Sequence, residues 1–246
     1  TRDLRDENLA AYPRTREAVG DQLCEYYGLI THLDEQVGRI LSALAASPHG
    51  DNTVVIYAAD HGLALGSHGL LGKQSVYEHS MRCPLIVAGP GIPHGTTAAF
   101  TYLFDIHPTL LDLAGVVRPD GLAGENLRPI WTGQRESVRD SIFLPFTDTM
   151  RAVRDRRWKL IVYPKIARRQ LFDLETDPGE MNDLSEDPRF EEPLQDLLQR
   201  MATWQSRVGD RQPLQGPTPA SGVLNLEGYQ RKPDPWQPAW IVEKYF

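Results

Sequence analysis

The feature that most constrains this chain is an almost wholly apolar segment at residues 53–59, Thr-Val-Val-Ile-Tyr-Ala-Ala. Its β-branched residues favour a strand, and side chains of this kind in every position leave no face suited to water. Such strands are usually covered on both faces, as in a parallel sheet flanked by helices. The segment is far too short to cross a bilayer, which needs about 20 residues. We therefore expect it to lie in the sheet of an α/β fold.

The segments on either side of this strand alternate between helix and strand patterns. Apolar residues recur every three or four positions through residues 15–46, which predicts a long amphipathic helix. Residues 84–88 indicate a second buried strand. Residues 108–115 indicate a short helix with Pro108 in its first turn and Gly115 at its end. This alternation predicts an α/β domain over residues 1–132.

The pattern changes after residue 132. Short strand-like runs at residues 141–146, 150–154, 158–163 and 170–174 are separated by polar turns, which predicts a small antiparallel sheet. Asp187-Pro188 then opens an amphipathic helix. We expect residues 133–208 to form an α+β subdomain. Residues 209–246 are rich in proline and are expected to be an extended tail that packs its terminal aromatic residues onto the body.

The sheet predicted for the first 130 residues has too few strands to cover its own apolar side chains. Two strands cannot cover a run like residues 53–59, and open apolar edges aggregate. We therefore expect strands from outside this sequence, so that the polypeptide is a fragment of a longer one or is completed by a second chain.

Asp60 and His61 follow the apolar strand directly, at the end where ligand sites form in open α/β sheets. A carboxylate beside an imidazole suits a divalent cation. The alternative is an ordinary turn, since Asp-Gly-type strand exits are common. Lys73 comes after a glycine-rich loop that contains His68. A lysine near a metal can balance a tetrahedral anion as a point charge, although a single lysine is more often a solvated surface residue.

Taken together, these residues resemble the sulfatase family of the alkaline-phosphatase-like superfamily. The match runs in order from about residue 10 to residue 205 and is carried by a set of short motifs. These are Asp60-His61-Gly62, His68-Gly69, Gly72-Lys73, Tyr77-Glu78, Arg82-Cys83-Pro84-Leu85-Ile86-Val87, Asp105-Ile106-His107-Pro108, Trp158-Lys159-Leu160 and Leu171-Phe172-Asp173-Leu174.

The resemblance implies a role for each matching residue. Asp60 and His61 would bind a divalent cation, which is most often calcium in these enzymes. Lys73 would contact the sulfate oxygens, so that Lys73 and His61 are the catalytic candidates. His68 would shape the loop first and face the substrate second. Asp105 is expected to cap a helix. The implied reaction is hydrolysis of a small-molecule or saccharide sulfate monoester.

The sequence departs from the family pattern in two places. The family's nucleophile is a formylglycine made from Cys or Ser in a Cys/Ser-x-Pro-x-Arg motif, and no such motif occurs here. The family also has a pair of metal-binding Asp residues on its first strand, and this sequence has no Asp-Asp pair. Both features belong to the amino-terminal half of the family. We therefore expect that half, with the formylglycine, to lie outside this sequence, and the 246 residues alone to be inactive.

Two rival functions stay open. One is a phosphonate monoester hydrolase or phosphodiesterase on the same scaffold, and the other is a non-catalytic subunit that keeps the fold and binds a partner chain or an anion. The formal net charge of -7 gives no indication of a nucleic-acid partner, and no apolar run is long enough to indicate a membrane partner.

Overall fold

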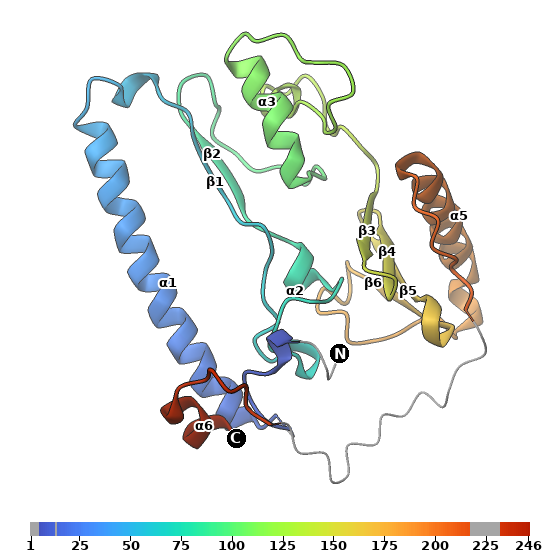
Figure 1. The fold of residues 1–246 in the computed structure, drawn as a ribbon. Helices are drawn as coiled ribbons and strands as arrows, with labels where there is room; N and C mark the ends of the chain where they lie inside the picture. The colour runs from blue at the N-terminus through green and yellow to red at the C-terminus, as the bar shows by residue number, and fades with distance from the viewer. Residues whose placement is uncertain (1–4, 13, 217–231) are drawn as a thin grey trace. The chain divides into compact units, whose positions relative to one another are not determined.

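A computed structural model describes residues 5–12, 14–216 and 232–246 (Figure 1). The chain divides into two compact units. The first unit combines Thr1–Thr53, His61–Cys83 and Ala220–Phe246, and the second combines Val54–Asp60 and Pro84–Pro219. Each unit is described by itself below. The domain boundaries expected from the sequence, after residues 132 and 208, stay predictions. Among the described residues, no helix combines the length and the apolar character needed to cross a membrane.

The first unit is dominated by helix α1, Arg16–Ala45, which confirms the predicted amphipathic helix. Thr15 caps it, because the Thr15 Oγ1 accepts a hydrogen bond from the backbone N–H of Ala18 at 3.2 Å. No residue of α1 is buried, and the side chains of Leu29 and Ile40 are 67% and 69% exposed. The described residues thus leave the apolar stripe of α1 largely uncovered.

The rest of the first unit consists of short turns and two short helices. The 3-10 turns are η1, Arg5–Glu7, η2, Gly50–Asn52, and η3, Ser67–Gly69. The helices are α2, Glu78–Met81, and α6, Ala239–Tyr245. A small buried cluster of Ala10, Leu71 and Tyr245 packs against Ala18 and Val19 of α1 and Ile241 of α6.

Helix α6 corrects the prediction of an extended tail. The end of the tail is helical, because Pro238 precedes seven residues without a helix breaker, and the buried Tyr245 anchors them. The backbone N–H of Ala11 donates to the carbonyl of Tyr245 at 2.8 Å. The expected packing of a terminal aromatic side chain is therefore seen at Tyr245, while Trp236 and Trp240 are exposed. Residues 217–231 of the predicted tail lie outside the described residues.

The second unit begins with strands β1, Val55–Ala58, and β2, Leu85–Ala88, which confirm the two predicted apolar strands. They pair antiparallel, with Val55 opposite Ala88 and Ala58 opposite Leu85, whereas a parallel sheet was expected. Apolar composition shows that a strand needs cover and carries no information on its direction. Within the described residues neither strand has a further neighbour, and Ile86 is 61% exposed.

The predicted small antiparallel sheet is confirmed. Its four strands are paired in chain order as β3, Ile142–Phe146, β4, Met150–Arg154, β5, Trp158–Tyr163, and β6, Arg168–Asp173. Strand β6 begins two residues earlier than expected. Ala167, in the left-handed region with φ 47°, completes the turn before it.

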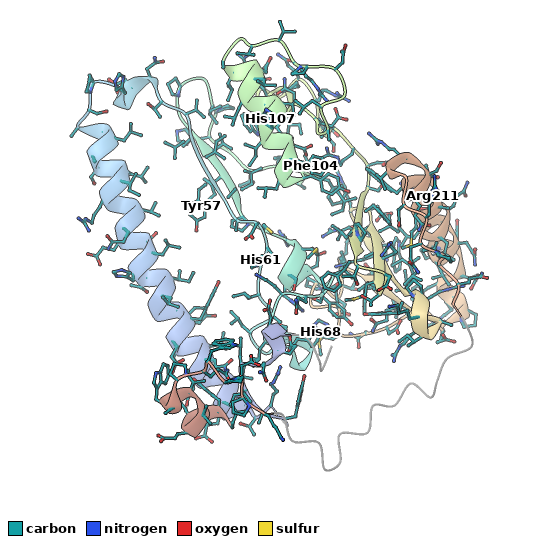
Figure 2. The ribbon with its side chains drawn as sticks, viewed as in Figure 1. Tyr57, His61, His68, Phe104, His107 and Arg211 are labelled. Atoms are coloured by element: carbon teal, nitrogen blue, oxygen red, sulfur yellow. The ribbon has the colours of Figure 1, made fainter. Side chains whose placement is uncertain are left out.

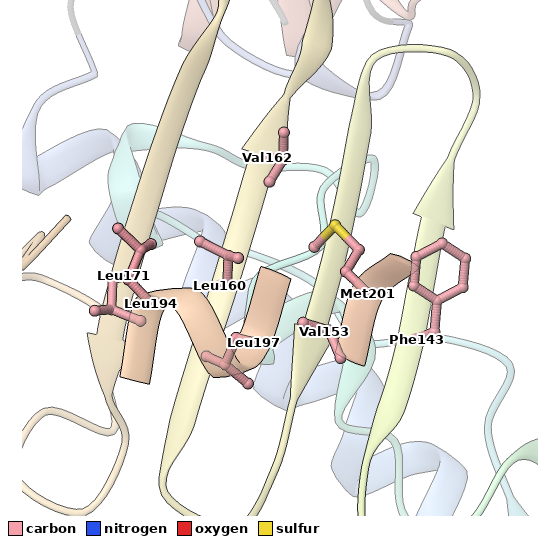
Figure 3. Close-up of a cluster of buried hydrophobic side chains, with 8 residues drawn as sticks. All are labelled: Phe143, Val153, Leu160, Val162, Leu171, Leu194, Leu197 and Met201. Carbon is pink, nitrogen blue, oxygen red and sulfur yellow. The ribbon is translucent and has the colours of Figure 1, made fainter. Parts of the chain in front are cut away.

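Helix α5, Glu191–Val208, packs on one face of this sheet and forms the main core of the second unit (Figure 3). A 3-10 turn at Pro188–Phe190 leads into it, as Asp187-Pro188 predicts, and Gly209 ends it with φ 71°. The helix buries Leu194, Leu197 and Met201. The sheet contributes Phe143, Val153, Leu160, Val162 and Leu171. An α/β part is thus followed by a small α+β part, as the sequence predicts.

Asp105 stands at the N-cap position of helix α3, Ile106–Leu113, but its side chain makes no capping hydrogen bond to that helix, so the expected helix cap is wrong. Its carboxylate accepts the backbone N–H of Tyr102 at 2.7 Å, which caps the 3-10 turn Leu103–Asp105 (η4) before helix α3. It also accepts the backbone N–H of Glu125 at 2.8 Å and forms a two-point ion pair with Arg139 at 2.6 and 2.8 Å. Asp105 is fully buried, so this ion pair fixes the path between α3, the short helix α4 at Arg128–Trp131, and β3.

Candidate functional site

Strand β1 leads directly to the predicted metal ligands. It ends at Ala58, and Asp60 is exposed two residues later, in the second unit. His61 is the next residue of the chain and begins a segment of the first unit (Figure 2). The expected position of Asp60, just after the carboxyl end of a strand, is therefore observed. Its role as a ligand stays a prediction.

Gly62 is required by close packing. A Cβ atom on Gly62 would lie 2.0 Å from the carbonyl oxygen of His79, far inside any allowed contact. The Gly62 N–H donates to the carbonyl of Ser80 at 2.8 Å, which ties the segment after His61 to helix α2. Any side chain at position 62 would push His61 away from this position.

Lys73 and His61 are in direct contact. The Lys73 Nζ lies 2.7 Å from His61 Nε2, and His61 Nδ1 lies 2.9 Å from the Gly62 carbonyl oxygen. Since a carbonyl only accepts, Nδ1 carries the proton and donates to it. Nε2 is then the nitrogen with the lone pair, and it accepts a hydrogen bond from the Lys73 ammonium. The imidazole is thereby held in one tautomer with its basic nitrogen turned toward Lys73.

The loop between His61 and Lys73 folds back on itself and brings these two residues together. The N–H of Ala64 donates to the carbonyl of Gly72 at 2.8 Å, and the N–H of Gly66 donates to that of Leu70 at 2.7 Å. Gly66 has φ 101°, and a Cβ there would meet the Val19 side chain at 2.4 Å. The loop is therefore both narrow and seated on helix α1.

Glu7 holds the residues just before Lys73, and no sequence motif predicted this role. Its carboxylate accepts the backbone N–H of Gly72 at 2.9 Å and that of Leu71 at 3.1 Å. Arg14 pairs with the same carboxylate at 2.6 Å and donates to the carbonyl of Gly69 at 3.0 Å. Both side chains are only 4% exposed. The Glu7–Arg14 pair thus binds the loop through hydrogen bonds to both its N–H groups and one of its carbonyl groups.

His68 shapes this loop. It adopts the left-handed conformation, with φ 56°, and stacks on Tyr77 with ring centroids 3.9 Å apart and an angle of 11° between the rings (Figure 2). The ring of His79 is 5.4 Å away. A contact between His68 and substrate stays a prediction.

The donor set for a cation is small within the described residues. No group of three or more His, Cys, Asp or Glu side chains gathers there in a way that could hold a metal. Asp60 offers one carboxylate, whereas the one lone pair of the His61 imidazole accepts from Lys73 in this structure. A carboxylate and an imidazole are ligand types that divalent cations accept, and a cation held by Asp60 and His61 stays a prediction.

The α/β part and the antiparallel sheet covered by one helix agree with the fold class expected from the sequence. The model of the family described as "N-sulphoglucosamine sulphohydrolase, C-terminal" matches residues 66–207, more than half of the chain. The model described as "Sulfatase" matches residues 3–116. The chain therefore belongs to the sulfatase family and matches its carboxyl-terminal region.

Known proteins agree with this assignment. Choline-sulfatase of Rhizobium meliloti is 36% identical over 198 residues, which are 76% of this chain and 36% of that protein. A protein solved in complex with its substrate D-glucosamine-2-N,6-O-disulfate has a TM-score of 0.69 and 28% identity, over 75% of this chain and 40% of that one. The phosphonate monoester hydrolase of Agrobacterium radiobacter has a TM-score of 0.66 and 29% identity, over 74% and 40%. The chain thus spans about a third of the length of the curated relatives it matches.

Proposed function

We propose that this chain supplies Asp60, His61 and Lys73 to the active site of a sulfuric ester hydrolase. The observation that carries the proposal is the 2.7 Å contact between Lys73 and His61, in a chain of the sulfatase family. A lysine that was merely a solvated surface group would not be held on an imidazole at the end of the loop. The substrate would be a small-molecule or saccharide sulfate monoester, since sulfatase relatives include a choline-sulfatase and an N-acetylglucosamine-6-O-sulfatase.

The three residues would share the work of charge neutralisation. Lys73 would present its ammonium to the non-bridging sulfate oxygens, where negative charge grows as the ester bond breaks. Asp60 and His61 would hold a divalent cation, whose contribution is that of a Lewis acid on the same oxygens. Calcium prefers oxygen ligands, whereas an imidazole ligand also suits transition metals, so calcium and manganese are the ions to compare.

The nucleophile would come from outside these 246 residues. The sequence contains no Cys/Ser-x-Pro-x-Arg motif from which a formylglycine could be made. Stabilising the oxyanion without an activated nucleophile leaves most of the reaction barrier in place. We therefore expect the isolated chain to show no turnover of an aryl sulfate, and an enzyme-like rate from this chain alone would overturn this part of the proposal.

A phosphonate monoester hydrolase is the second candidate, favoured by the structural similarity to the enzyme of Agrobacterium radiobacter. The same lysine and cation would serve its tetrahedral oxyanion. The two functions are separated by comparing kcat/KM on 4-nitrophenyl sulfate and on a 4-nitrophenyl phosphonate monoester, with the enzyme purified as it occurs in its cells. A clear preference for the phosphonate would replace sulfatase by this alternative.

The role of Lys73 is tested in the same enzyme. Lys73→Ala should lower kcat on 4-nitrophenyl sulfate by ~100-fold or more, as is usual when one group that stabilises an oxyanion is removed. Lys165→Ala is the matched control, since Lys165 forms an exposed ion pair with Asp148, and it should leave kcat unchanged. Equal kcat for Lys73→Ala and Lys165→Ala would refute the role of Lys73.

The cation site is tested by isothermal titration calorimetry of the chain with Ca²⁺ and Mn²⁺. Asp60→Asn removes the charged ligand and should weaken binding at least tenfold. Asp51→Asn removes the same charge from an exposed residue of the η2 turn and should leave binding unchanged. Identical isotherms for the parent and Asp60→Asn would refute a cation at Asp60.

A further inference from the structure

The second unit contains a cavity that the proposed function does not use. Its volume is about 650 Å³, and it lies between residues 135–140, the turn between β4 and β5, and helix α5. Five arginines line it, against two acidic residues, Asp140 and Asp155. The arginines are Arg135, Arg139, Arg156, Arg157 and Arg200. A chain with a formal net charge of -7 has thus gathered about a fifth of its Lys and Arg residues around one hollow.

Three of these arginines are held in place by acids outside the cavity. Arg139 pairs with the buried Asp105 at 2.6 Å, and Arg200 pairs with Asp196 at 2.6 Å. Arg157 pairs with Asp173 at 2.8 Å, and its guanidinium stacks over the neighbouring Trp158 ring at 4.7 Å. The burial of Arg139 and the stacking of Arg157 fix these side chains before any ligand arrives, which lowers the entropic cost of binding.

Both acids of the cavity wall also have partners. Asp140 lies 3.3 Å from Arg200. Asp155 accepts the backbone N–H groups of Arg157 and Trp158 at 2.9 and 2.7 Å. The two carboxylates have partners of their own, and five arginines outnumber two acids at this wall.

Arg135 and Arg156 are the remaining two arginines of the wall. Both are exposed, and neither side chain forms an ion pair or a hydrogen bond with any residue that the structure describes. Arg135 and Arg156 thus line this cavity, and neither guanidinium group has an ion pair with an acid that the structure describes. A guanidinium binds an oxyanion through two parallel N–H donors, and it is weakly hydrated, so it suits sulfate groups well.

We propose that this cavity binds sulfate groups of a sulfated oligosaccharide, with Arg135 and Arg156 as the main contacts. The choice of sulfate over other oxyanions rests on the proposed function, since a hydrolase of saccharide sulfates meets substrates with several sulfate groups. The site would hold a sulfate that is not being hydrolysed.

The test is direct binding of fluorescent hexasaccharides to the 246-residue chain, which requires no nucleophile. A fully sulfated heparin hexasaccharide should bind at 50 mM salt, and its chemically desulfated counterpart should bind at least tenfold more weakly. Arg135→Ala/Arg156→Ala should weaken binding of the sulfated probe by tenfold or more, because two charge-assisted contacts are lost. Both residues are exposed, so thermal unfolding of the variant should match that of the parent.

The matched control is Arg168→Ala/Arg211→Ala, which removes the same charge from two exposed arginines of the second unit that do not line the cavity. Arg211 is labelled in Figure 2. It should change affinity less than twofold. Equal loss in both double variants would mean that binding follows net charge alone, and would overturn the proposal. Tighter, cavity-dependent binding of inositol hexakisphosphate than of the sulfated hexasaccharide would overturn the choice of sulfate.

The outcome is independent of the catalytic proposal. If Arg135→Ala/Arg156→Ala binds the sulfated probe like the parent while Lys73→Ala abolishes turnover of 4-nitrophenyl sulfate in the enzyme, the cavity proposal fails and the proposed function stands. If Lys73→Ala keeps its kcat while the cavity variant loses binding, the proposed function fails and the cavity remains an oxyanion site.

Discussion

Replacing Glu7 by Gln should loosen the loop that carries Lys73. The change keeps the size of the side chain and removes its charge. In the parent, the carboxylate accepts the N–H groups of Leu71 and Gly72 and pairs with Arg14, and all of this is shielded from water. Hydrogen bonds to a charged acceptor stabilise by ~1.5–3 kcal/mol, against ~0.5–1.5 kcal/mol for a neutral one.

The expected cost follows from these contacts. Two N–H groups each lose about 1 kcal/mol when the acceptor becomes neutral. Arg14 is left buried without its counter-charge, although it keeps the carbonyl of Gly69 as an acceptor. Removing one partner of a fully buried pair costs ~3–5 kcal/mol, but the amide oxygen of Gln still accepts from Arg14, so we take this part of the cost as only ~0–2 kcal/mol. We therefore expect a total of ~2–4 kcal/mol, which corresponds to ~30–1,000-fold faster exchange of the Leu71 and Gly72 amides.

Amide hydrogen exchange resolved to single residues measures this directly. Glu35→Gln is the control, because it removes one charge from the exposed middle of α1 and should leave these two amides unchanged. A second variant, Glu7→Gln/Arg14→Met, removes the unpaired charge and should recover part of the protection. The reasoning is refuted if Leu71 and Gly72 exchange at the parental rate in Glu7→Gln while both remain protected.

Two further predictions concern ion pairs of the antiparallel subdomain. Lys159 and Glu180 form an ion pair at 2.7 Å, and their side chains are 0% and 1% exposed. Lys159→Met should therefore lower the free energy of unfolding in urea by ~3–5 kcal/mol, and Lys159→Met/Glu180→Leu should recover most of this loss. A loss below ~1 kcal/mol for the single variant would contradict this prediction. The hydrogen bond from Arg151 lowers the pKa of Asp210 to about 2, against an ordinary value of 3.8. A lowered folded-state pKa contributes stability above pH 3.8 that is lost as the pH falls toward 2, so Asp210→Asn should cost up to about 2 kcal/mol at pH 7 and flatten the loss between pH 4 and pH 2. An equal loss of unfolding free energy between pH 4 and pH 2 in the parent and in Asp210→Asn would contradict this prediction.

Local pattern was sufficient to predict most of the elements. The period of apolar residues located α1 and α5, and the alternation of residues located β3, β4 and β5 to within one residue. These elements are encoded by residues that are neighbours in the sequence. Helix α6 was missed because it is short, follows a proline-rich stretch and is stabilised by a distant contact at Tyr245.

Direction and cover of the strands could not be predicted in the same way. The pairing of β1 with β2 depends on the path of the chain between them, and an all-apolar strand gives no sign of that path. The periodicity of α1 identifies the face that needs a partner, and it does not say whether that partner belongs to the same 246 residues.

Some residues of the candidate site could be predicted from the sequence, and others could not. The motif around Asp60, His61 and Lys73 was visible because it is short, and the structure brings Lys73 to His61. Glu7 was not visible, since it acts on residues 64 and 65 positions further along the chain and has no sequence motif of its own. The cavity arginines were equally hidden, because two of them lie before β3, two after β4 and one on α5.

The contact between Lys73 and His61 has a consequence for how the proposed site would work. Nδ1 of His61 is committed to the Gly62 carbonyl, so the imidazole has a single lone pair, on Nε2. That lone pair cannot accept from the Lys73 ammonium and coordinate a cation at once. In the proposed site a cation on His61 would therefore leave all three N–H donors of Lys73 free for an oxyanion.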